Sequence, residues 1–316
     1  MDQRQILSII ILSYESEKNI ESITRKVIHT MKEENIPFEI IIMDDGSKDQ
    51  SYRIAQNLSA SNDNIKTFQL SKNFNSPYAM FAGLSMSRGA CAVVIPDDLQ
   101  RPLHTVVAQY RKWQEGAKIV IAYRASREDG ILSDLFSSFY YFIMNTFSKV
   151  NFPPGGADGF LADREVVDIL VNRISHKNTS PIIEVLQLGF DPVFIPFDRP
   201  KSTTGSRWTL KKKISLAMNT FFASSTFPVK LVTFFGFCMF SIAFIVSLFV
   251  IYAKIFTDNT LFGFPVPGWA TIILVTMFFN GMTMLSLGII AEYIWRIFEE
   301  VKGRPPYIIR NKNEES

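Results

Sequence analysis

The chain has 316 residues, and 33 Lys and Arg nearly balance 30 Asp and Glu, which leaves a formal net charge of +3. This balance argues against a general nucleic-acid binder, because such proteins usually carry a basic excess on one face. Cys91 and Cys238 lie far apart, the second within an apolar run, which excludes a disulfide-stapled secreted scaffold. Residues 1–5 are polar and lead directly into a strand-like run, so no cleaved signal peptide is expected.

Hydrophobicity is distributed unevenly along the chain. Hydrophobic residues make up 47% of the sequence and charged residues 20%. The mean hydropathy of +0.12 is high for a soluble enzyme and low for a transporter with many spans. The average therefore covers two unlike regions. We predict a soluble domain over residues 1–208, a juxtamembrane helix over 209–228, a transmembrane hairpin over 229–295 and a cytosolic tail over 296–316.

The first region has the alternating strands and helices of an α/β domain. Its predicted strands are apolar runs of the kind that is buried in parallel sheets, and a helical pattern of apolar residues follows the first. This alternation predicts a doubly wound sheet that binds ligands at the carboxyl ends of its strands. The predicted strands are Ile6–Leu12, Phe38–Met43, Ala90–Ile95 and Ile119–Ala122, and the helix is Lys18–Glu34.

Acidic residues follow two of these strands. Asp44, Asp45 and Asp49 come after the second strand, and Asp97 and Asp98 come after the third. Acidic side chains at a strand end can bind a ribose or a base, and a second cluster nearby can hold a divalent cation together with substrate phosphates. Either cluster alone could simply be a turn or a helix cap. Together they favour a nucleotide and metal site, whereas the glycine patterns of P-loop and dinucleotide-binding proteins are absent.

The region after residue 208 has the pattern of a membrane anchor. Residues 209–228 combine a basic and an apolar helical face, which predicts a helix in the headgroup layer or, alternatively, an ordinary surface helix. Residues 231–253 and 269–291 are two runs of 23 residues without a charge. As helices each would extend about 34 Å, which is sufficient for a hydrocarbon core of about 30 Å. We therefore predict two membrane spans.

Basic residues flank the two runs on their outer sides. The segment between the runs has only Lys254 and Asp258 as charged residues. The positive-inside rule then predicts that both termini and the first domain are cytosolic. The predicted location is the bacterial plasma membrane, with two spans.

Several motifs in order along the chain resemble those of family 2 glycosyltransferases. Within that family the sequence is similar to the branch that contains dolichol-phosphate mannose synthase and bacterial undecaprenyl-phosphate glycosyltransferases. The resemblance implies a GT-A fold, Rossmann-like with a mostly parallel sheet, followed by an amphipathic interface helix and a two-helix transmembrane hairpin. The motifs are Ile9–Ile20, Ile40–Asp49, Leu70–Gly89, Asp97–Gln100, Pro154–Arg164, Ser206–Trp208 and Glu292–Pro305.

The resemblance implies inverting transfer of a single sugar from a nucleotide diphosphate sugar, with a UDP-sugar favoured. By alignment with the family's metal motif, Asp98 and Gln100 would hold Mg²⁺ or Mn²⁺ beside the leaving diphosphate. Asp98 would thereby be catalytic. The residues expected to bind the nucleotide sugar are Leu12, Tyr14, Glu15, Asp44, Asp45, Lys72, Asn73 and Asp97.

The implied acceptor is the phosphate of a polyprenyl phosphate, with undecaprenyl phosphate favoured, and the implied assembly is a homo-oligomer. Asp158, the second predicted catalytic residue, would orient the acceptor or a cation, although it could also simply shape a turn. Arginine side chains suit bidentate phosphate recognition. Arg124 and Arg127 could instead be solvated surface charges, and Lys211 could instead help to set the orientation of the chain in the membrane. The residues expected to bind the lipid phosphate or the diphosphate are Arg124, Arg127, Arg199, Ser206, Arg207 and Lys211.

Three positions depart from the family pattern. Pro96 occupies the first aspartate position of the metal motif, Ser16 replaces a glutamate in the opening turn, and Phe160 stands where the acceptor loop usually has an arginine. An alternative function is therefore a catalytically weak protein that binds nucleotide sugars and acts as a scaffold in glycan assembly.

Overall fold

The computed structural model describes residues 5–98, 101–125, 156–177, 179–198 and 268–310, together with separate positions between 232 and 265. The chain divides into two compact units. One consists of residues 1–224 and 305–316, and the other of residues 225–304. The C-terminal residues thus group with the N-terminal unit.

The first unit is built on a seven-stranded sheet with the order β3-β2-β1-β4-β6-β5-β7. Strand β6 runs antiparallel to β4 and β5, and every other neighbouring pair is parallel. This confirms the predicted α/β class with a mostly parallel sheet. The strands are β1 (Leu7–Ser13), β2 (Phe38–Asp44), β3 (Ile65–Gln69), β4 (Cys91–Pro96), β5 (Ile119–Arg124), β6 (Gly159–Asp163) and β7 (Val193–Phe197).

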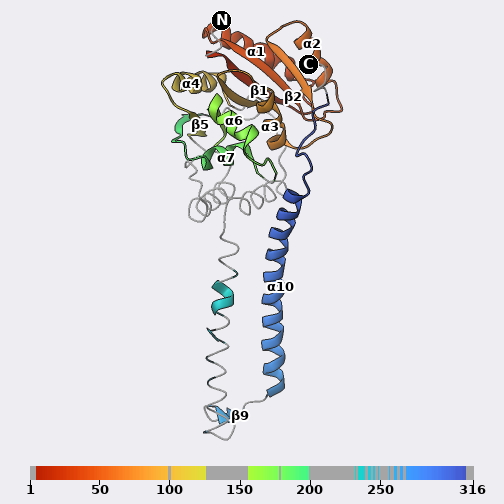
Figure 1. Ribbon diagram of the computed structural model, residues 1–316, viewed down its shortest axis with the longest axis vertical. Helices are drawn as coiled ribbons and strands as arrows, with labels where there is room; N and C mark the ends of the chain where they lie inside the picture. Colours follow the sequence, from red (N-terminus) through yellow and green to blue (C-terminus); the bar gives the residue numbers. More distant parts are fainter. Residues whose placement is uncertain are drawn as a thin grey trace. The chain divides into compact units, whose positions relative to one another are not determined.

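Helices cover both faces of the sheet (Figure 1). Along β1, Ile9 and Ile11 enter the core shared with α1, α2 and α4, whereas Ile10 enters the core shared with α3, α6 and α7. Because both faces are buried, the central strands have no polar alternation. The helices are α1 (Ile20–Glu33), α2 (Ser51–Ala60), α3 (Ser76–Met86), α4 (Leu103–Gln114), α6 (Arg164–Asn172) and α7 (Pro181–Gln187).

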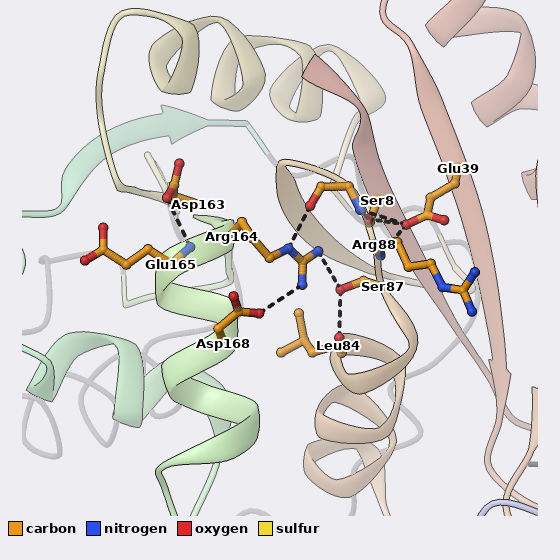
Figure 2. A network of polar contacts seen from close by, with 10 residues as sticks. Ser8, Glu39, Leu84, Ser87, Arg88, Asp163, Arg164, Glu165 and Asp168 are labelled. Carbon is orange, nitrogen blue, oxygen red and sulfur yellow. Dashed lines mark hydrogen bonds and ion pairs between the residues drawn. The ribbon is translucent and has the colours of Figure 1, made fainter. Parts of the chain in front are cut away.

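A polar network connects the edge of the sheet where β1, β2 and β4 begin (Figure 2). The Glu39 carboxylate accepts hydrogen bonds from the Ser8 hydroxyl, at 2.5 Å, and from the backbone amides of Arg88, at 2.6 Å, and Gly89, at 3.0 Å. Arg164 Nε donates to the Gly89 carbonyl at 2.8 Å. Arg164, the last residue of a family-like motif, therefore stabilises the edge opposite the ends of the parallel strands.

The second unit contains helix α10 (Gly268–Val301) and a short antiparallel pair, β8 (Thr260–Leu261) with β9 (Phe264–Pro265). The predicted second span, residues 269–291, falls within α10. Among the residues that the structure describes, no helix combines the length and the hydropathy that a membrane crossing requires. The predicted juxtamembrane helix over 209–228 lies outside the described residues, and the run 231–253 is described only at separate positions.

Candidate active site

The described members of the predicted site lie at the edge where the parallel strands end. In the sheet register, Ser13 lies opposite Asp44, and Leu12 lies opposite Pro96, the residue before Asp97. Strand β6 runs in the opposite direction, so Asp158, which precedes it, lies at this same edge. The register partner of Gly159 is Ala122, two residues before Arg124. Residues from five strand ends therefore surround one region, as expected for an α/β sheet.

The turn after β1 and the turn after β2 are joined by hydrogen bonds to consecutive backbone amides. The amide of Glu15 donates to Ser47 Oγ at 2.9 Å, that of Ser16 to Ser51 Oγ at 2.6 Å, and that of Glu17 to Asp49 Oδ2 at 3.2 Å. Glu15 has φ +50°, a conformation that is uncommon for a residue with a side chain. These hydrogen bonds join the two predicted nucleotide-binding segments.

Asp44 is fully buried, and its carboxylate shapes the turn that follows. Oδ1 accepts a hydrogen bond from the Ser47 hydroxyl at 2.5 Å, and Oδ2 accepts from the Ser47 amide at 2.9 Å and from Gln69 Nε2 at 3.0 Å. These contacts make Asp44 a positioning group within the protein. Its predicted direct contact with a nucleotide stays a prediction.

The Asp45–Ser47 turn packs closely against the segment around Lys72. Gly46 has φ +70°, and a Cβ there would lie 2.5 Å from the Lys72 carbonyl carbon, so only glycine fits. The backbone amide of Phe74 donates to Asp45 Oδ1 at 2.7 Å. Burial raises the pKa of the Asp45 carboxyl to about 6, against the opposing effect of this hydrogen bond. The side chains of Lys72 and Asn73 remain exposed beside the turn.

Tyr14 and Glu15 are also exposed at this edge, and Leu12 is partly exposed. We refer to the three joined segments, residues 13–17, 44–51 and 69–75, as the donor cradle, because the resemblance assigns binding of the donor to residues within them. Hydrogen bonds join its turns, and the side chains of Glu15, Lys72 and Asn73 are exposed.

The turn after β4 contains the predicted metal ligand Asp98. Asp98 is exposed and Asp97 partly exposed, and Gln100 lies outside the described residues. Within the described ranges, no three or more His, Cys, Asp or Glu side chains form a cluster that could enclose a metal. An exposed carboxylate next to the donor cradle fits an oxygen-preferring cation such as Mg²⁺ or Mn²⁺, which commonly combines one or two protein carboxylates with substrate phosphates.

Asp158 and Arg124 contact each other across the β5–β6 end of the site. Arg124 Nε donates to Asp158 Oδ2 at 3.2 Å, and Nη2 donates to Oδ1 at 3.4 Å. Both side chains keep partial exposure, 19% for Arg124 and 31% for Asp158. The structure thus joins the predicted second catalytic residue to a predicted phosphate-binding arginine.

A buried arginine that the sequence analysis missed supports this pair. Arg101 is 3% exposed and donates from Nη2 to the Val94 carbonyl. Its guanidinium fills the space where a Cβ on Gly159 would lie, which explains the glycine after Asp158. Burial lowers the pKa of Arg101 to about 10, and the charge of Asp158 opposes this effect. No pattern in the sequence marks Arg101 as buried, because it follows a polar motif.

Most of the predicted lipid-phosphate residues lie outside the part of the chain that the structure describes. Arg124 is the described member of that set. The remaining members lie outside the described residues, namely Arg127, Arg199, Ser206, Arg207 and Lys211.

The mostly parallel strand order, with polar residues at the ends of its strands, defines a GT-A-like α/β domain. Residues 8–168 match the model of glycosyl transferase family 2, and the chain belongs to this family. It is a glycosyltransferase, which confirms the resemblance found in the sequence.

The relatives extend over nearly the whole chain. An uncharacterised glycosyltransferase of Synechocystis sp. is 32% identical over 96% of this chain and 94% of its own. The bactoprenol glucosyl transferase of Shigella phage SfV is 28% identical over 98% of this chain and 99% of its own. Among solved structures, mannosyl-3-phosphoglycerate synthase from Rubrobacter xylanophilus aligns with a TM-score of 0.47 and 18% identity, over 68% of this chain and 71% of its own.

Proposed function

We propose that this glycosyltransferase moves a single sugar from a nucleotide diphosphate sugar, with a UDP-sugar favoured, to the phosphate of a polyprenyl phosphate, with undecaprenyl phosphate favoured. The observation that carries the proposal is the position of the Arg124–Asp158 pair at the same sheet edge as the donor cradle. A donor and an anionic acceptor could therefore meet there. The name of the phage relative, a bactoprenol glucosyl transferase, supports a polyprenyl acceptor.

The chemistry needs charge compensation more than a strong base. The nucleophile is an oxygen of a phosphate monoester, whose second pKa is about 6, so it is largely dianionic at neutral pH. Its main obstacle is repulsion from the anionic donor. Arg124, oriented by both oxygens of Asp158, would offset part of that repulsion by donating hydrogen bonds to phosphate oxygens. Asp158 would act mainly by orienting this cation or the acceptor, and in-line attack would invert the anomeric centre.

Asp98, with Gln100, would hold Mg²⁺ or Mn²⁺ against the donor diphosphate. A bound divalent cation supplies Lewis-acid neutralisation of the charge that develops on the leaving nucleotide diphosphate. The residues of the donor cradle would bind and orient the nucleotide.

We further propose that the chain is anchored in the bacterial plasma membrane by two spans, residues 231–253 and 269–291, with both termini and the catalytic domain cytosolic. A polyprenyl chain cannot leave the bilayer readily, since each exposed CH₂ costs about 0.8 kcal/mol. The enzyme must therefore reach the headgroup layer. Large apolar side chains exposed along α10 support a lipid environment for that helix, among them Ile272, Val275, Phe278, Met284, Leu287 and Ile290.

The test is transfer of radiolabel from nucleotide sugars to a polyprenyl phosphate by the purified full chain with Mg²⁺ or Mn²⁺. We expect a lipid-extractable product from the wild type. Asp98→Ala should lose about 100-fold or more of the activity, as happens when a group that stabilises developing charge is removed. Asp63→Ala, which removes an exposed carboxylate from the α2–β3 turn, is the matched control and should retain full activity.

Two results would count against the proposal. Wild-type turnover by Asp98→Ala would remove the metal assignment. No labelled lipid from the wild type with any common donor would favour the scaffold alternative, in which the chain binds nucleotide sugars without transferring them.

A further inference from the structure

The residues after α10 return to the first unit and bind at the edge of its sheet. The amide of Ser71 donates to the Ile308 carbonyl, and the amide of Arg310 donates to the Gln69 carbonyl, both at 2.8 Å. Leu70 and Ile309 form an antiparallel bridge between these two bonds. Residues 305–310, which we call the C-terminal latch, thereby cover the end of the edge strand β3, where unpaired backbone groups would otherwise be exposed.

Side-chain packing fixes the latch from its other side. The Tyr307 ring stacks on His176 with 5.9 Å between ring centroids, and His176 stacks on Phe81 of α3 at 4.0 Å. Tyr307 and Ile309 both pack against the hydrophobic core that α3, α6 and α7 share with the sheet. Burial raises the pKa of the Tyr307 hydroxyl. The latch is therefore an integral part of the domain.

The last described residue of the latch begins a chain of polar contacts that ends in the donor cradle. Arg310 Nη1 donates to Gln69 Oε1 at 3.4 Å, and Nη2 donates to the Ser71 carbonyl at 3.3 Å. Gln69 Nε2 donates in turn to Asp44 Oδ2 at 3.0 Å. Asp44 holds Ser47, whose hydroxyl oxygen accepts from the Glu15 amide.

The guanidinium of Arg310 determines how the Gln69 amide is oriented. A guanidinium can only donate hydrogen bonds, so it pairs with the oxygen of the Gln69 amide and turns the nitrogen toward Asp44. Without that donor, the Asp44 carboxylate alone would orient the Gln69 amide, whose side chain would then have more rotational freedom. The hydrogen bond from Gln69 to Asp44 would then be less well fixed, and the turn that Asp44 shapes would be less ordered.

We propose that Arg310 and Gln69 are positioning residues of the donor site, so that the C-terminal latch completes the nucleotide-binding cradle. This inference rests on the proposed function, because it assigns the cradle to the nucleotide. It goes beyond that function by making donor affinity depend on a side chain 241 positions away from the glutamine it orients.

The experiment measures binding of UDP and of GDP to the full-length protein with Mn²⁺ by titration calorimetry, and then the KM and kcat for the matching donor sugar. For Arg310→Ala we expect roughly 3- to 10-fold weaker nucleotide binding, the effect of one lost hydrogen bond. The donor KM should rise by the same factor while kcat stays within about twofold, because Arg310 does not touch the reacting atoms.

Companion variants separate positioning from general stability. Arg310→Lys keeps a donor-only cation and should restore most of the affinity, whereas Arg310→Gln, which can present either end of its amide, should not. Arg304→Ala removes an exposed arginine just before the latch and should bind like the wild type. Melting temperatures of all variants reveal any that have lost the fold, and Arg310→Lys against Arg310→Gln remains a test if Arg310→Ala is one of them.

Equal nucleotide affinity for the wild type, Arg310→Ala and Arg310→Gln would overturn the inference and leave the proposed function standing. So would a drop in kcat that follows the melting temperature with an unchanged donor KM. No binding of either nucleotide by the wild type would instead overturn the proposed function, and the inference with it.

Discussion

At the scale of single residues, the donor cradle contains a carboxyl group, that of Asp45, whose ionised form is destabilised by burial. Asp45 is 5% exposed, and burial raises its pKa from 3.8 to about 6. The Asp45 carboxyl of the folded protein therefore stays protonated to a higher pH than that of the unfolded chain. The contribution of the protonated form to stability is fully present below pH 3.8 and is lost as the pH rises through about 6.

Asp45→Asn should remove this pH dependence. The asparagine oxygen can still accept the hydrogen bond from the Phe74 amide, but the side chain no longer ionises. A shift of this size corresponds to at most about 3 kcal/mol at neutral pH. We therefore expect the melting temperature of Asp45→Asn, relative to the wild type, to be higher at pH 7.5 than at pH 4.5, with weaker nucleotide binding. Asp63→Asn, at an exposed position, is the control, and an equal difference at both pH values would contradict the role of Asp45.

At the scale of elements, the turn between β2 and α2 depends on a close backbone approach. Gly46→Ala would place a Cβ 2.5 Å from the Lys72 carbonyl carbon at a φ of +70°. Gly189 has a similar φ of +77° with nothing within 4 Å, so Gly189→Ala has the same backbone strain without the clash. We expect Gly46→Ala to lower the free energy of unfolding by about 2 kcal/mol more than Gly189→Ala does.

The measurement is chemical or thermal unfolding of both variants, together with UDP binding. Gly46→Ala should weaken UDP binding because the turn and the Lys72 segment must separate. If the two variants were equally stable, the packing of the turn against Lys72 would not contribute to stability.

The elements also show which parts of the fold a single sequence can predict. Strands β1, β2, β4 and β5 were predicted because burial on both faces requires an unbroken apolar run. Strand β3, at one edge of the sheet, contains Lys66 and Thr67 in IKTFQ, and β6 is the short run GFLAD, so neither has that pattern. The direction of β6 is determined by tertiary pairing and has no local signal.

The same reasoning explains the candidate site. Asp44, Asp45, Asp97 and Asp98 could be placed together because parallel strands end at one edge. Asp158 reaches that edge only through the reversed strand. Arg101, Gln69 and Arg310 were missed because their contacts join segments that are distant in the sequence, and a lone polar residue gives no indication of its partner.

At the scale of the whole molecule, the charge of +3 and the mean hydropathy of +0.12 are averages over two unlike parts. One is an α/β unit whose apolar residues are buried in two cores. The other has apolar side chains exposed on a long helix and two runs without charges. This division fits the proposal that a water-soluble donor and a lipid acceptor are joined by one enzyme, because each substrate is found in a different solvent.

The proposed orientation predicts which side of the membrane each segment faces. Cys91 is buried, and burial raises the pKa of its thiol, so it should not react with maleimides. Cys238 is half-buried within the first apolar run. The labelling experiment therefore starts from a background variant, Cys238→Ser. On that background, Asp258→Cys tests the segment between the runs, and Lys302→Cys tests the residues after α10.

In intact spheroplasts, a membrane-impermeant maleimide should label Asp258→Cys and should label Lys302→Cys only after permeabilisation. The reason is that the connecting segment has one Lys and one Asp, whereas basic residues flank the outer side of each run. The background variant without a new cysteine gives the unlabelled baseline, and sugar transfer by each variant shows that it is correctly folded. The reversed pattern would contradict the orientation, and labelling of both cysteines in intact spheroplasts would contradict a two-span hairpin.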